Sequence, residues 1–138
     1  MNSRQLAVAL LILRIALAVF LLLFGIDKLV AAETTISVFA HYYGLSISVP
    51  VAHAAGVLEI LLSLAMLAGL WKTITYGLGL LLHAISTLAT YEQLLSPFGE
   101  NHLFIAGLPV LAAFIALFLL RRQDTLLSLA ASAREQHK

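Results

Sequence analysis

Four long apolar stretches, joined by short polar links, make up most of this 138-residue chain. They run over about residues 6–24, 50–70, 76–95 and 103–120. A helix needs about 20 apolar residues to cross the hydrocarbon core of a bilayer, and each stretch meets that length. The sequence therefore predicts an all-α fold, a polytopic membrane four-helix bundle that forms a single domain over residues 1–138.

The composition excludes most classes of soluble protein. Hydrophobic residues make up 62% of the chain and charged residues only 11%, whereas about 25% of an average soluble domain is charged. A soluble domain of this size buries only about 70% of the surface that its unfolded chain exposes. The net charge of +1 provides no basic patch for nucleic acid. The chain has no cysteine, so it has no thiol for disulfides, metal binding or electron relay.

The distribution of basic residues predicts the orientation in the membrane. With the N-terminus inside, only Lys28 falls on the outer side, and Arg14 falls within the first span. The cytoplasmic side then carries Arg4, Lys72, Arg121, Arg122, Arg134 and Lys138. This positive-inside bias predicts that both termini are cytoplasmic, and we expect an integral protein of the bacterial inner membrane. Cleavage of a signal peptide after residues 30–32 is not expected, because the preceding stretch is long and contains an arginine.

Prolines and aromatic residues predict the details between the spans. Pro109 lies inside the fourth stretch and should kink it, and residues 71–75 form a tight link between antiparallel neighbours. Residues 34–43 carry three aromatic side chains and end at Gly44, which is typical of a short interfacial helix. The tail over residues 121–138 mixes leucines with basic residues, as does a helix on the cytoplasmic surface. A frayed tail explains the same composition equally well.

Three ionisable residues fall within predicted spans, where each costs about 2.5–3.5 kcal/mol to insert. At a rise of 1.5 Å per residue, Arg14, Glu59 and His83 lie about 12, 16 and 11 Å from the cytoplasmic ends of their spans. Small or hydroxyl-bearing residues share their helix faces, with Ser63 near Glu59 and Thr87 near His83. We therefore expect an ion pair between Arg14 and Glu59, with His83 nearby.

This cluster has two interpretations. In the structural one, the ion pair fixes the helix register and His83 is a neutral core residue. In the functional one, the cluster surrounds a small polar cavity for a quinone headgroup, another small ligand or a proton, since histidine beside a carboxylate exchanges protons near neutral pH. A quinone is the candidate ligand. A haem held by His53 and His83 is disfavoured, because their depths differ by about 10 Å.

A second set of polar residues is expected at the outer rim of the bundle. Its members are Asp27, Lys28, His53, Glu92 and His102. Histidine and carboxylate side chains suit zinc or copper(II), but these residues are scattered over several segments and form no HExxH motif. A hydrated acidic rim is expected here rather than a metal site.

The first half of the chain resembles the DoxX/DoxD-like membrane proteins. The resemblance rests on Arg14, Phe24-Gly25, Lys28, Phe39, Pro50, Gly56, Glu59, Leu67, Gly69-Leu70 and Thr73. It covers about residues 14–76. The chain departs from the pattern at Leu62-Ser63, where glycines are common, and at Lys72, which precedes Thr73 instead of following it.

The resemblance implies a four-helix integral membrane protein in which Arg14, Lys28 and Glu59 form a shared interior polar set. Some DoxX-like proteins resemble the membrane subunit of a thiosulfate:quinone oxidoreductase, and others accompany redox or stress-response systems. We therefore expect a subunit of a respiratory or sulfur redox system, with a redox protein or a second copy as partner, and not an enzyme that acts alone. The alternatives are a structural or assembly subunit and a small transporter or metal-handling protein.

Overall fold

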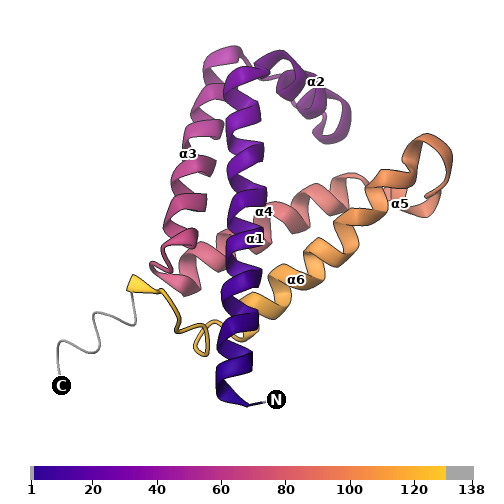
Figure 1. The fold of residues 1–138 in the computed structure, drawn as a ribbon. Coiled ribbons are helices and arrows are strands. Elements are labelled where there is room, and N and C mark those ends of the chain that lie inside the picture. The colour runs from indigo at the N-terminus through magenta and orange to yellow at the C-terminus, as the bar shows by residue number, and fades with distance from the viewer. Residues whose placement is uncertain (1, 130–138) are drawn as a thin grey trace.

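The computed structural model describes residues 2–129, and within that range the chain is helical and contains no strand (Figure 1). The prediction of an all-α fold is confirmed. In chain order the elements are α1 (Ser3–Val30), α2 (Ala32–Tyr43), α3 (Val49–Leu67), α4 (Lys72–Ala89), α5 (Tyr91–Leu95), the 3₁₀ helix η1 (Gly99–Ala106) and α6 (Gly107–Leu119).

Three segments have the length and apolar composition of a membrane span. They are α1, α3 and the continuous stretch Gly99–Leu119, which combines η1 with α6. The remaining predicted span, residues 76–95, corresponds to α4 and α5, which are separated at Thr90. Helix α4 is more polar because it carries lysine, tyrosine, histidine and several hydroxyl residues. The four-helix membrane bundle and its orientation remain predictions.

The long helices are arranged as two antiparallel pairs. Helices α1 and α3 lie side by side, and α4 and α6 form a second pair that is inclined to the first (Figure 1). Helix α2 folds across the end of the first pair, whereas α5 and η1 lie at the far end of the second. The start of α1 and the end of α6 lie at the same end of the molecule (Figure 1).

A glycine contact sets the register between α1 and α3. A Cβ atom on Gly56 would lie 2.8 Å from the carbonyl oxygen of Gly25, and one on Gly25 would lie 3.1 Å from that of Gly56. Side chains larger than hydrogen would therefore push the two backbones apart. This close crossing decides which residues of α1 and α3 lie at the same level.

The packed core lies between the two helix pairs. It consists of Leu10, Leu17, Ala18, Leu21, Met66, Tyr76, Phe114 and Leu117, which are all buried. Large apolar side chains also cover the outside of the helices: Leu58 is 67% exposed and Leu88 is 70% exposed. An apolar exterior of this extent is suited to lipid rather than to water.

Pro109, which was expected to kink the fourth span, lies near the start of α6. The chain changes from the 3₁₀ helix η1 to α6 at Gly107, which places Pro109 in the first turn of α6. Proline is tolerated in the first turn of an α-helix, because the N–H groups of that turn make no hydrogen bond within the helix. The predicted end of the interfacial segment is confirmed, since α2 ends at Gly44 in the left-handed conformation (φ 64°).

The helix expected over residues 121–138 is absent at residues 121–128. Residues 120–128 form turns and irregular backbone, Leu129 is helical, and Asp124 is fully buried. The backbone N–H of Leu129 donates to the carbonyl oxygen of Ala68 at 3.1 Å, which ties this segment to the link between α3 and α4. Residues 130–138 of the predicted tail lie outside the described residues.

Candidate functional site

The intramembrane charges form two separate centres instead of one cluster. Arg14 pairs with Asp124 at 3.0 Å, and Glu59 pairs with Lys28 at 2.6 Å. The predicted ion pair between Arg14 and Glu59 is therefore wrong. The physical reason is the helix register: starting from the Gly25–Gly56 contact, Arg14 lies about 12 Å further along the helix axes than Glu59, at 1.5 Å per residue.

Arg14 belongs to a closed and buried centre. One of its terminal nitrogens, Nη1, donates to both carboxylate oxygens of Asp124 at 3.0 Å, and the other donates to the carbonyl oxygens of Leu126 at 2.7 Å and Leu127 at 2.9 Å. The Tyr76 hydroxyl donates to the same carboxylate. Arg14 is 1% exposed and Asp124 is 0% exposed, so each charge is buried only because the other neutralises it.

This centre attaches the segment after α6 to the rest of the fold. The Lys72 ammonium donates to the backbone oxygen of Asp124, and the Ser128 hydroxyl donates to the carbonyl oxygen of Gly69 at 3.3 Å. Gly69 is in the left-handed conformation (φ 68°), and a Cβ on it would lie 3.0 Å from Nη1 of Arg14. The contacts hold the chain in place and leave little room for a ligand.

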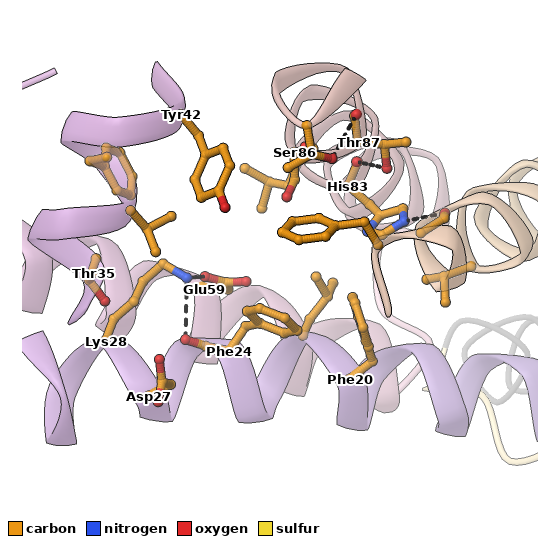
Figure 2. A pocket seen from close by; sticks show the side chains of 18 of the residues that line it. Phe20, Phe24, Asp27, Lys28, Thr35, Tyr42, Glu59, His83, Ser86 and Thr87 are labelled. Atoms are coloured by element: carbon orange, nitrogen blue, oxygen red, sulfur yellow. Dashed lines mark hydrogen bonds and ion pairs between the residues drawn. The ribbon is translucent and has the colours of Figure 1, made fainter. Parts of the chain in front are cut away.

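The second centre lies in an open cleft of about 610 Å³ that extends from the Lys28–Glu59 pair to His83. Side chains of α1, α2, α3, α4, η1 and α6 line it (Figure 2). Most of the lining is apolar or aromatic, including Phe20 and Phe24. The cleft therefore combines flat apolar walls with polar groups at separated points.

Lys28 and Glu59 form the polar group at one side of the cleft. The two side chains are 17% and 12% exposed, so water reaches both in part. The Lys28 ammonium also donates to the carbonyl oxygen of Phe24 at 3.2 Å and lies 5.7 Å from the centre of the Phe24 ring. The pair carries no net charge, yet it offers both a strong donor and a strong acceptor to a ligand.

His83 forms the polar group at the other side. Its Nε2 lies 2.9 Å from the carbonyl oxygen of Gly107, and because a carbonyl can only accept, Nε2 carries the hydrogen. In the neutral ring Nδ1 is then an acceptor, and no partner for it lies among residues 2–129. The ring stacks on Phe114 with centroids 5.5 Å apart and meets the edge of Phe20 at 5.4 Å. These contacts fix the orientation of the His83 ring, and Nδ1 is left as a hydrogen-bond acceptor.

Tyr42 completes the polar set, although the sequence placed it only at the membrane surface. Figure 2 shows its hydroxyl pointing toward the Lys28–Glu59 pair, and none of the residues 2–129 accepts a hydrogen bond from it. Thr35, Phe39 and Tyr42 all line the cleft, and their spacing in sequence places them on one face of α2. That spacing was a readable signal that α2 presents a face to the protein.

The other candidate residues have different places. Thr87 lines the cleft and its hydroxyl donates to the backbone oxygen of His83 at 2.8 Å. Ser63 is buried, donates to the carbonyl oxygen of Ile60 at 2.8 Å and does not line the cleft. Its proximity to Glu59 in sequence did not bring it to the site.

The predicted outer rim is divided by the fold. Asp27 and Lys28 line the cleft, whereas His53, Glu92 and His102 are exposed on separate elements. Within residues 2–129, no three histidine or carboxylate side chains are grouped so that they could hold a metal ion.

Asp124 is the partner of Arg14 that sequence reasoning missed. It lies in a stretch with two arginines and several leucines, which suggested a surface helix instead of a buried ion pair. The available signal was a carboxylate soon after the last apolar stretch, in a chain whose first span contains an arginine but no carboxylate.

The fold and the cleft define an all-helical protein of membrane-spanning composition with a cleft that has polar groups at both ends. The family model named DoxX matches residues 9–92, and the chain belongs to this family. The match includes Arg14, Lys28, Glu59 and His83 and ends before η1. A search of curated proteins found no match, and neither did a search of solved structures.

Proposed function

We propose that this DoxX-family protein is the membrane subunit of a redox system and that its cleft binds the headgroup of a quinone. The observation that carries the proposal is the cleft itself, in which aromatic walls lie between the Lys28–Glu59 pair with Tyr42 on one side and His83 on the other. A volume of about 610 Å³ falls within the range of roughly 300–1,000 Å³ that is typical of small-molecule sites.

The polar groups suit the chemistry of a quinone. Its ring is flat, and its two carbonyl oxygens lie on opposite edges and require hydrogen-bond donors. Lys28 and Tyr42 supply donors on one side, and the Nδ1 acceptor of His83 on the other side suits a hydroxyl group of the reduced quinol. Two electrons and two protons convert a quinone to a quinol. The chain contributes residues that hold protons, and a partner redox protein must supply the electrons, since the chain contains no thiol.

We also propose that α4 is the fourth membrane crossing and that both termini are cytoplasmic. The Arg14–Asp124 pair joins the first half of α1 to the segment after α6, which supports an even number of crossings between the two termini. The distribution of basic residues favours the cytoplasm as the shared side. With this orientation the cleft lies toward the outer half of the bilayer, and the bacterial inner membrane is the location that we propose.

A structural role is favoured only for the other polar centre. The Arg14–Asp124 pair is closed, buried and occupied by protein groups, as expected of a contact that fixes the fold.

Quinone binding can be measured on the purified protein in nanodiscs with decylubiquinone as the probe. Wild type should be stabilised against thermal unfolding by about 2.7 kcal/mol at a quinone concentration 100-fold above Kd. Tyr42→Phe removes one hydrogen bond of about 1 kcal/mol and should weaken binding roughly fivefold. His53→Ala, an exposed change on α3, is the control. Wild type without any stabilisation, or equal losses in Tyr42→Phe and His53→Ala, would contradict the proposal.

A further inference from the structure

A second cavity of about 300 Å³ lies on the flank of the molecule between α1 and α6. Leu13, Ala16 and Phe20 line it from α1, and Pro109, Val110 and Ala113 line it from α6. We call it the flank groove. None of its lining side chains is polar, so it offers nothing to a headgroup, a metal ion or a charged substrate.

The flank groove borders the polar cleft. Phe20 and Val110 line both hollows, so the cleft and the groove adjoin at these two side chains. The groove is also open at the surface of the protein, since Ala16 and Pro109 are exposed. Both helices that form it belong to segments of membrane-spanning composition, which places the opening against lipid.

We infer that the flank groove holds the polyprenyl tail of a membrane quinone whose headgroup occupies the cleft, an inference that rests on the proposed function. A membrane quinone has a flat polar headgroup and a long apolar tail. The cleft, which has polar groups, matches the headgroup, and the apolar flank groove matches the tail. The ligand enters sideways from the bilayer, so the tail never crosses water.

Small side chains create the groove. Ala16 and Ala113 lie where most neighbouring positions on α1 and α6 carry leucine, isoleucine or phenylalanine. From Leu13 to Phe20 the groove follows α1 for about 10 Å, at 1.5 Å per residue. This length accommodates the first isoprene units only, and the rest of the tail extends into the lipid.

The test compares two ubiquinones that differ only in the tail, one without isoprene units and one with two. Ala16→Phe fills the groove from an exposed position on α1. Ala113→Leu fills the groove from α6 and is the second variant, to be used if Ala16→Phe folds poorly. Ala112→Phe, an exposed alanine beside the groove position, is the matched control. For each quinone the readout is the Kd of the variant divided by the Kd of wild type, in which the partition of that quinone into lipid cancels.

We expect Ala16→Phe to weaken binding of the tailed quinone roughly tenfold and to leave the tail-less quinone and the Ala112→Phe control unchanged. Tyr42→Phe should weaken binding of both quinones to the same extent. If both quinones bind and the groove variants affect neither, or affect both equally, the tail site is overturned while the headgroup site stands. If neither quinone binds wild type, the proposed function fails and the tail site fails with it.

Discussion

Arg14 and Lys28 lie on the same helix, but the protein accommodates the two cations differently. Arg14 is completely enclosed, and its charge is met by a carboxylate and two backbone oxygens. Lys28 remains partly exposed beside a single carboxylate. The first arrangement suits a fixed structural contact, whereas the second leaves a donor that a ligand can reach.

Removing the partner of Arg14 should destabilise the protein strongly. Asp124→Leu leaves an uncompensated buried charge, and we expect a loss of about 3–5 kcal/mol in the free energy of unfolding. The Arg14→Leu/Asp124→Leu double variant should recover much of that loss, because no charge is then stranded. Chemical denaturation in detergent measures both variants.

The same experiment separates the observed pair from the one that the sequence suggested. A double-mutant cycle between Arg14 and Glu59 should give a coupling energy near zero, since the two belong to separate centres. Strong coupling between Arg14 and Glu59, together with none between Arg14 and Asp124, would contradict the structure.

The sequence identifies which residues are unusual better than it identifies their partners. An ionisable residue in an apolar stretch is visible from composition alone, and Arg14 and His83 are indeed buried. The partner depends on how far one helix is shifted along another, and here the shift comes from a backbone contact between two glycines. Counting residues from the ends of predicted spans does not include that contact.

At the scale of elements, the α1–α3 pair depends on the absence of side chains at Gly25 and Gly56. Lys28 packs against the same point, since a Cβ on Gly56 would lie 3.0 Å from the Cβ of Lys28. Widening this crossing would therefore also move the Lys28–Glu59 pair in the cleft.

Gly56→Ala should destabilise the protein by about 1–3 kcal/mol, despite the higher helix propensity of alanine. The new methyl group would meet the backbone of α1, which cannot move aside as a side chain can. Gly77→Ala on α4 is the control, because its Cβ would meet only the edge of the Phe118 ring at 3.3 Å. Thermal unfolding of both variants is the measurement, and an equally stable Gly56→Ala would show that the crossing is looser than described.

The helices themselves were largely predictable, and their ends were less so. Apolar stretches located α1, α3 and α6, and Gly44 correctly marked the end of α2. The transition at Gly107 and the separation of α4 from α5 at Thr90 depend on packing between distant segments. The burial of Asp124 depends on an arginine more than 100 residues earlier, which no local pattern reveals.

At the scale of the whole molecule, the two polar centres lie apart along α1, one at Arg14 and the other at Lys28. The first joins α1 to the segment after α6, and the second lies in the open cleft. This separation places the fixed contact and the ligand site at different depths in the proposed membrane orientation.

The orientation can be tested by cysteine labelling, since the chain has no cysteine of its own. Glu100 and Gln123 are both exposed. A membrane-impermeant maleimide added to intact cells should label Glu100→Cys and should label Gln123→Cys only after the cells are opened. The reverse pattern would overturn the proposed orientation.

Native mass spectrometry of the protein, extracted gently from quinone-containing membranes, tests the proposed binding of a quinone most directly. We expect wild type and His53→Ala to retain one quinone per chain. The Lys28→Met/Glu59→Leu variant, which loses the polar pair without stranding a charge, should retain none. Wild type that carries no quinone, or a variant that retains it as well as wild type does, would contradict a quinone site in the cleft.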